Sequence, residues 1–172
     1  ECAFDFCENL KQVEIPSNSE LRYIGDYAFS HSILTDFKVP SHLIEVEKYA
    51  FSYCKYFESF EIPQNSELQI IGNYSFLCAP IKKISIPSHL TQINAGTFHD
   101  CNKLQIVEIP TDSQLKVIGA SAFSLSTIEK IRIPSHVMNI GESAFMRCNK
   151  LQCVEIPDDS ELRIIENFAF TD

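Results

Sequence analysis

The sequence predicts a solenoid, a stack of short coils joined mainly by parallel β-strands, and two regularities carry this prediction. Phenylalanine recurs at alternating intervals of 25 and 22 residues, beginning with Phe4, Phe29 and Phe51. A segment that alternates apolar and variable residues and ends in proline, such as residues 13–16, recurs at the same rate. Fixed periods between about 20 and 50 residues are typical of solenoids, propellers and repeat arrays.

The length of the repeat decides between these architectures. A unit near 23 residues is too short for a four-stranded propeller blade or a helical hairpin, so each coil should hold one strand, one turn and one short element. Seven proline-ended segments follow one another in the 172 residues. The sequence therefore predicts about seven rungs, arranged in a 47-residue double repeat of one long and one short coil.

The first strand of each coil is the proline-ended segment. In residues 13–15 the alternation places Val13 and Ile15 on one face and Glu14 on the other, as in a half-buried strand. Proline is tolerated where the strand ends, because the hydrogen-bond ladder stops there. The repeated phenylalanines, and small residues three positions later, should form interior columns. These anchors are Phe29, Phe51, Phe76, Phe98, Phe123 and Phe145, with Cys7, Cys54, Cys101 and Cys148 in the column of small side chains.

The rest of each coil should contain a second short strand and a turn. We expect the second strands around the Leu-x-x-Ile segments, such as residues 21–24, and short helical turns at the Ala-Phe segments. The five glycines lie in or beside the turn before Ala-Phe, where a positive φ or a close backbone approach is expected.

The whole chain, residues 1–172, is expected to form a single solenoid domain. It begins and ends inside a coil without the polar caps that solenoids need, which indicates a fragment of a longer array whose uncapped ends could associate end to end. We find no signal peptide, membrane-spanning run or lipidation motif, so direct membrane insertion is not expected of this fragment.

The repeat also resembles a known family. Its pattern is Ala-Phe-x-x-Cys-x-x-Leu-x-x-Val-x-Ile-Pro followed by x-Leu-x-x-Ile-Gly-x-x-Ala-Phe, and residues 97–110 show the first part almost complete. This pattern resembles the BspA-like leucine-rich repeat family of bacterial and protist surface antigens, and the alternating long and short coils look more like the protist members. The resemblance implies a right-handed leucine-rich repeat solenoid at a cell surface or outside the cell, with adhesion to host proteins or other cells as the usual proposal.

The cysteines and histidines raise questions of disulfide and metal chemistry. Cysteines two rungs apart lie roughly 10 Å from one another, too far for a disulfide, so the cysteine column should hold free buried thiols. Bridges from Cys78 to a neighbouring rung, or within Cys2/Cys7 and Cys148/Cys153, stay conceivable. Histidines two rungs apart cannot converge on one metal ion, so turn residues with local hydrogen bonds are favoured. These histidines are His42, His89 and His136.

The middle residue of each predicted strand forms an outward strip in which acids alternate with bases or serine. Neighbours in a parallel sheet lie about 5 Å apart, so opposite charges can pair along it. The strip has two interpretations, a self-neutralising ladder on a solvated face or a surface that recognises a protein partner. Its members are Glu14, Lys38, Glu61, Ser85, Glu108, Arg132 and Glu155.

All six tyrosines lie within the first 74 residues. Tyr27, Tyr49 and Tyr74 each stand two residues before an anchor phenylalanine, so they should form one column on adjacent coils, with Tyr53 and Tyr56 nearby. Tyrosine is favoured at binding hot spots because it offers a large area with a polar tip. The column is therefore either a partner-binding patch or a stack that stabilises neighbouring coils.

A second apolar column occurs only in the long coils. It consists of Tyr23, Ile70, Val117 and Ile164, where short coils carry Glu45, Gln92 and Asn139, and it is either a lateral contact surface or additional core. Asn73-Tyr74-Ser75 is a glycosylation sequon, consistent with surface exposure.

These patterns favour a binding module over an enzyme. No phosphate-binding loop, metal-binding motif or nucleophile elbow occurs, so neither catalysis nor a cofactor is expected. The net charge of −9 disfavours nucleic acid and anionic membranes as partners. We expect a non-catalytic module that binds host extracellular-matrix or cell-surface proteins. The alternative is a structural or antigenic spacer, or an intracellular scaffold, without a ligand of its own.

Overall fold

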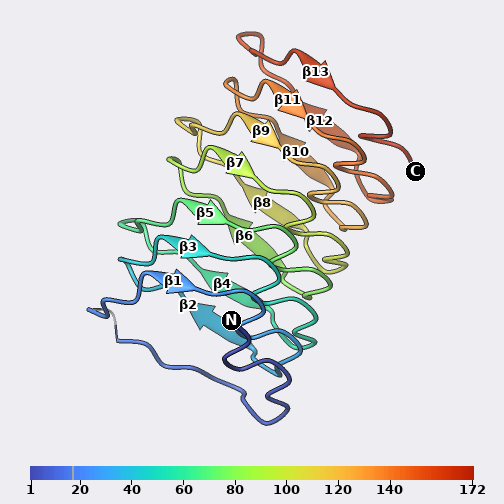
Figure 1. Cartoon of the computed structure of the whole chain (residues 1–172). Coiled ribbons are helices and arrows are strands. Elements are labelled where there is room, and N and C mark those ends of the chain that lie inside the picture. The colour runs from blue at the N-terminus through green and yellow to red at the C-terminus, as the bar shows by residue number, and fades with distance from the viewer. Residues whose placement is uncertain (17) are drawn as a thin grey trace.

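The computed structural model describes residues 1–16 and 18–172, which form one continuous stack of coils (Figure 1). Thirteen short strands lie on two faces of the stack, and successive strands of each face come from successive coils. All recorded strand pairs are parallel, so the predicted solenoid is confirmed.

The two faces carry strands of different length. Proline-ended segments form the three-residue strands β2 (Asp36–Lys38), β4 (Ser59–Glu61), β6 (Lys83–Ser85), β8 (Ile106–Glu108), β10 (Lys130–Arg132) and β12 (Cys153–Glu155). The Leu-x-x-Ile segments form the two-residue strands β1 (Tyr23–Ile24), β3 (Glu45–Val46), β5 (Ile70–Ile71), β7 (Gln92–Ile93), β9 (Val117–Ile118), β11 (Asn139–Ile140) and β13 (Ile164–Ile165).

The two faces also pair differently. The two-residue strands form a three-stranded sheet, β1-β3-β5, and a four-stranded sheet, β7-β9-β11-β13. The three-residue strands form three separate pairs, β2-β4, β6-β8 and β10-β12. Each of these pairs joins a short coil to the long coil that follows it, so the 47-residue double repeat is also the unit of strand pairing.

The expectation of seven equivalent rungs was too high, because about six turns of the solenoid carry the three-residue strand. Residues 13–15 do not form a strand, although Val13 and Ile15 are half-buried as the alternation predicts. These residues belong to a long coil, and a long coil does not pair with the short coil that follows it on this face. Just before residues 13–15, the Lys11 carbonyl accepts a hydrogen bond from the Thr35 N–H at 3.2 Å.

The expected helical turns at Ala-Phe are wrong, because no helix occurs among the described residues. In the coil around Phe29, the N–H groups of Ala28, Ser30 and Ser32 bond to the carbonyl three residues earlier. The alternating N–H groups of residues 27, 29 and 31 instead bond to carbonyls of the next coil at 2.8 to 3.1 Å. A helix would direct all its N–H groups along its own axis. The segment is therefore a run of consecutive β-turns that also joins neighbouring coils.

The anchor phenylalanines form the central column of the core, as predicted. Ring centroids of successive anchors lie 5.1 to 5.6 Å apart, and the rings are stacked from Phe4 to Phe170. Six of the anchors, from Phe29 to Phe145, are buried. The ring spacing matches the distance between paired strands, so each coil contributes one aromatic layer to the core.

Long and short coils differ at the corner that follows the proline. In the short coil around Pro87, the Leu90 N–H bonds to the Pro87 carbonyl and the chain turns at once. In the long coil, Ser66 closes the same turn on Pro63, and its hydroxyl then accepts a hydrogen bond from the Leu68 N–H at 3.2 Å. This serine turn accounts for the additional residues of the long coil. Equivalent serines at 19, 113 and 160 repeat it at the same distance.

Candidate binding surfaces

The predicted tyrosine column exists and has an unusual backbone. Tyr27, Tyr49 and Tyr74 have φ values of 55°, 57° and 55°, in the left-handed region that bulky residues rarely occupy. Their rings stack at 4.9 Å between Tyr27 and Tyr49 and at 5.2 Å between Tyr49 and Tyr74. The turn that links neighbouring coils therefore also places successive tyrosine rings against one another.

Each of these tyrosines is half-buried, which is compatible with both interpretations of the column. Burial raises the pKa of the Tyr49 hydroxyl, and the neighbouring Tyr27 and Tyr74 hydroxyls raise it further. Stacking uses the ring faces, while part of each side chain stays open to a partner.

Gly96 ends the run of tyrosines in this column. It has a φ of +59° and stands where the next tyrosine would be. A Cβ on Gly96 would lie 2.1 Å from Cε1 of Tyr74, so the Tyr74 ring occupies the space that any side chain would need. Ser121 and Ser143 continue the column in the C-terminal half with φ values of 53° and 56°. The tyrosines of this column therefore lie in the first coils, and Phe168, with a φ of 58°, places an aromatic ring at the last position of the column.

A second column of positive φ values lies two residues after each anchor phenylalanine. Phe6, His31 and Tyr53 stack there, with ring centroids 4.2 and 4.9 Å apart. Tyr53 and Tyr56 are 45% and 48% exposed, and Lys55 Nζ lies 5.0 Å from the Tyr56 ring centroid. We call these two columns and Tyr56 the aromatic surface. Its members are Phe6, Tyr27, His31, Tyr49, Tyr53, Tyr56 and Tyr74.

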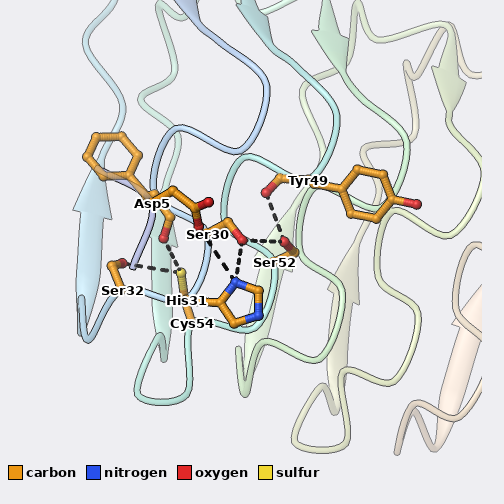
Figure 2. Close-up of polar contacts among 8 residues, drawn as sticks. Asp5, Ser30, His31, Ser32, Tyr49, Ser52 and Cys54 are labelled. Atoms are coloured by element: carbon orange, nitrogen blue, oxygen red, sulfur yellow. Dashed lines mark hydrogen bonds and ion pairs between the residues drawn. The ribbon is translucent and has the colours of Figure 1, made fainter. Parts of the chain in front are cut away.

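A polar cluster around His31 of this surface brings together an aspartate, a histidine and serines (Figure 2). Ser30 Oγ lies 2.7 Å from His31 Nδ1, and Asp5 Oδ1 lies 3.7 Å from the same nitrogen. A catalytic triad needs the serine and the carboxylate on opposite ring nitrogens. Because both groups meet Nδ1 and Ser30 is fully buried, the cluster cannot relay a proton to a substrate.

The seven cysteines are all free in the structure, as predicted for the main column. Cys54, Cys101 and Cys148 are buried, and their thiols donate hydrogen bonds to the carbonyls of Phe29, Phe76 and Phe123 at 3.0 to 3.1 Å. Burial raises the pKa of the Cys54 thiol to about 11 and raises that of Cys101 well above its usual range. These thiols therefore stay protonated and tie adjacent coils together. Cys7, at the start of the column, is half-buried.

The charged strip has the predicted register on the three-residue strands, with Lys38 opposite Glu61, Ser85 opposite Glu108 and Arg132 opposite Glu155. The ion pairs differ from the expectation, because the bases come from two residues earlier in the strand. Lys83 Nζ lies 2.6 Å from Glu108, and Lys130 pairs with Glu155.

Hydrogen bonds from Lys83 and then Ser85 lower the Glu108 pKa. Glu14 is exposed on the segment that does not pair. Two glutamates of the strip, Glu108 and Glu155, are therefore paired through lysines that the sequence interpretation left out. Lys38, Glu61 and Arg132 form no ion pair with the described residues, so both interpretations of the strip stay open.

The three histidines bond to the coil next to them. His42 and His136 each place Nδ1 3.0 Å from a carboxylate oxygen, of Glu67 and Glu161 respectively. His89 instead places Nε2 2.8 Å from the Leu68 carbonyl. All three stand in turns, as expected, although their partners belong to neighbouring coils rather than to the turns themselves.

The long-coil apolar column points outward, which answers the question that the sequence left open. Tyr23, Ile70 and Ile164 are 57%, 41% and 52% exposed, and Val117 is half-buried. They belong to an outer face and not to the core. Asn73 of the sequon is exposed too, and its Oδ1 accepts a hydrogen bond from the Ala95 N–H at 3.2 Å. No helix among the described residues is long and apolar enough to cross a membrane.

The comparisons with known proteins concern the fold and the repeat. A family model described as "BspA type Leucine rich repeat region (6 copies)" matches residues 1–105 and 69–172. A leucine-rich repeat protein from Bacteroides ovatus has a TM-score of 0.74 and 22% identity, over 96% of this chain and 53% of its own. The leucine rich repeat protein of T. pallidum has a TM-score of 0.73 and 25% identity, over 82% and 67%.

A leucine rich cell surface protein from Faecalibacterium prausnitzii has a TM-score of 0.60 and 25% identity, over 81% of this chain and 43% of its own. The chain thus spans about half the length of the Bacteroides structure and less of the Faecalibacterium one. No curated protein matches the chain.

Proposed function

The chain belongs to the BspA-type leucine-rich repeat family, and from this premise we propose that it is a non-catalytic protein-binding module displayed at a cell surface, where it acts in adhesion. The fold supports an interaction role, because a solenoid uses its inward residues for stacking and its outward residues for partners. One structurally similar protein is described as a cell surface protein, which supports the location. The partners we propose are host extracellular-matrix or cell-surface proteins.

The aromatic surface is the observation that carries this proposal. It contains exposed and half-buried tyrosines on turns that are hydrogen-bonded to neighbouring coils. Tyrosines are enriched where binding energy concentrates at interfaces. Rings that are already stacked lose little conformational freedom when a partner binds, which favours affinity. A self-neutralising surface without this aromatic area would be the expected design of a spacer.

The experiment measures binding of the chain to a panel of extracellular-matrix and cell-surface proteins, beside a Tyr27→Ser/Tyr49→Ser variant. Serine is the matched replacement, because Ser121 and Ser143 occupy the same column with the same positive φ. A Ser121→Ala variant serves as the control at a non-aromatic position of the same column. Saturable binding that weakens tenfold or more in the folded tyrosine variant, and not in the control, supports the proposal. Affinity unchanged by the tyrosine variant would remove the aromatic surface from consideration.

The competing function, a structural or antigenic spacer or an intracellular scaffold, has its own supporting observation. Ion pairs between coils, such as Lys82 with Glu58 and Lys130 with Glu155, join opposite charges on or beside the three-residue strands. Such exposed pairs contribute little energy each, about 0 to 1 kcal/mol, so they are consistent with a surface that serves solubility alone. Absence of binding to every protein of the panel would favour this alternative.

A further inference from the structure

The alternation of long and short coils produces a notch at the proline corner. Where the short coil at residues 85–89 lies between two long coils, the structure has a cavity of about 410 Å³. We call this cavity the 85–89 notch. Its apolar lining includes Ile62, Pro63, Ile86, Pro87 and Pro110, and its polar lining includes Gln64, Ser85, His89 and Asp112. A volume of this size lies in the range of ligand-binding cavities.

The notch is open because this coil departs from the repeat. The short coils before and after it carry Lys38 and Arg132 where this one carries Ser85. At the next notch along the stack, Arg132 belongs to the lining and the cavity measures only about 90 Å³. The small serine therefore leaves open the space that a long basic side chain helps to fill at the equivalent position.

A second departure occurs at the same notch and affects His89. The histidines of the other two short coils, His42 and His136, bond to glutamates, but the equivalent long-coil position here is Gln114. His89 uses Nε2 to donate to the Leu68 carbonyl instead, and in the neutral imidazole Nδ1 is then a hydrogen-bond acceptor. Asp112 forms no ion pair with the described residues, so its carboxylate is free as well.

These groups define the chemistry of an occupant. The apolar walls suit an aliphatic stem. An imidazole nitrogen that accepts hydrogen bonds suits a donor, and the aspartate carboxylate favours a donor that carries positive charge. A planar guanidinium can bond to a carboxylate through two parallel N–H groups and stack on flat rings. The net charge of −9 favours a basic partner in addition.

We propose that the 85–89 notch receives an arginine side chain of a protein partner, held by Asp112 and His89 against the prolines. The inference rests on the proposed protein-binding function and adds a recognition site to it, on a different face from the aromatic surface. Ser85 is a specificity-determining residue of this site, because a lysine or arginine there would occupy the place of the incoming side chain.

The test is a titration of the chain with Nα-acetyl-arginine methylamide, followed by NMR of the His89 ring and the isoleucine methyl groups. The citrulline analogue has the same shape without the charge and is the ligand control. Because so small a ligand makes few contacts, the dissociation constant should be on the order of 1 mM. Saturable shifts at His89, with at least tenfold weaker binding of the citrulline analogue, are the expected result.

Three variants locate the site. Ser85→Lys copies Lys38, and Asp112→Asn copies Asn65 at the equivalent corner, so both residues are already accepted by the repeat. Each should weaken binding tenfold or more. Asp159→Asn makes the matching change at the 90 Å³ notch and should leave affinity unchanged. If Ser85→Lys does not fold, Asp112→Asn still decides.

Several results would overturn the assignment. These are equal affinities in all variants, equal binding of the citrulline analogue, or no shift at His89. If Nα-acetyl-lysine methylamide binds as tightly as the arginine derivative, the choice of arginine as the occupant would be overturned. The titration does not involve the aromatic surface, so its failure can be separated from failure of the protein panel. A panel partner that binds Asp112→Asn as well as wild type would count against the notch and not against the proposed function.

Discussion

Replacing Gly72 with alanine should destabilise the solenoid, because two coils approach most closely there. A Cβ on Gly72 would lie 2.7 Å from both the carbonyl carbon of Glu47 and the N atom of Lys48, which are backbone atoms of the preceding coil. Ordinary van der Waals contact begins at 3.4 Å, so the coils would have to separate locally by about 0.7 Å. No flexible side chain is available to give way.

The expected magnitude follows from what this separation does to the bonds around it. The Gly72 N–H donates to the Val46 carbonyl at 2.7 Å, and the Tyr49 N–H donates to the Asn73 carbonyl at 3.0 Å. A shift of 0.7 Å would lengthen these bonds to about 3.4 and 3.7 Å, beyond the usual range of N–H···O bonds. Overpacking typically costs about 1 to 3 kcal/mol, and each weakened bond adds up to about 1 kcal/mol. Alanine also stabilises the protein by roughly 0.4 to 1 kcal/mol, because it lowers the conformational entropy of the unfolded chain. The net loss should be about 1 to 3 kcal/mol.

Urea unfolding followed by circular dichroism measures this loss, with Gly25→Ala as the matched control. At Gly25 the nearest atom to a new Cβ is 3.2 Å away, at the N atom of Glu1, and the next is 3.7 Å away. We expect that variant within about 0.5 kcal/mol of wild type. Both variants should keep the wild-type dependence on urea, since neither changes the surface exposed on unfolding. Equal losses at the two glycines would refute the close-approach reasoning.

Three further predictions concern the core, a thiol and the end of the tyrosine ladder. Phe76→Ala removes a fully buried ring from the central column and should lower the free energy of unfolding by about 3 to 5 kcal/mol, whereas a loss below 1 kcal/mol would contradict the stacked core. Burial raises the pKa of Cys54 from 9.0 to about 11, so this thiol's stabilisation should be complete below pH 9 and decline as pH rises to 11, by roughly 1.4 kcal/mol per pH unit at most. In the Cys54→Ala variant, the free energy of unfolding should decline less between pH 9 and pH 11 than in wild type. The same pH dependence in both proteins would contradict this prediction. Gly96→Ala should expel the Tyr74 ring from its place and cost about 1 to 2 kcal/mol for the positive φ, and unchanged NMR signals of Tyr74 would disprove the contact.

The repeat made the interior predictable from sequence. A residue that recurs in every coil must satisfy the same neighbours above and below, so Phe29, Phe51 and their equivalents could be assigned to one column without coordinates. The alternation in the proline-ended segments similarly predicted which residues face inward. Repetition is a strong signal because it samples one environment many times within a single chain.

The turns were not predictable in the same way, because most of their residues are of types that rarely adopt the positive φ values found there. Positive φ values are expected at glycine or asparagine, but tyrosines and other bulky residues occupy most of these positions. Gly96 was the only glycine in the column, and one glycine among tyrosines looked like a departure instead of the rule. Backbone hydrogen bonds to the next coil impose the positive φ values. Such hydrogen bonds do not depend on the side chain, so the local sequence does not reveal them.

The proposed site lies where two coils depart from the repeat. Ser85 and Gln114 are 29 residues apart and belong to different coils, and each alone looks like ordinary variation at an outward position. The structure brings their effects together, because one leaves a cavity open and the other leaves a histidine without a carboxylate at the same notch. A selection for stacking alone would favour the lysine, arginine and glutamate that the other coils carry. Two coincident departures at the larger of two equivalent cavities are therefore better explained by an occupant than by relaxed constraint, and Asp112→Asn distinguishes these explanations without disturbing the stack.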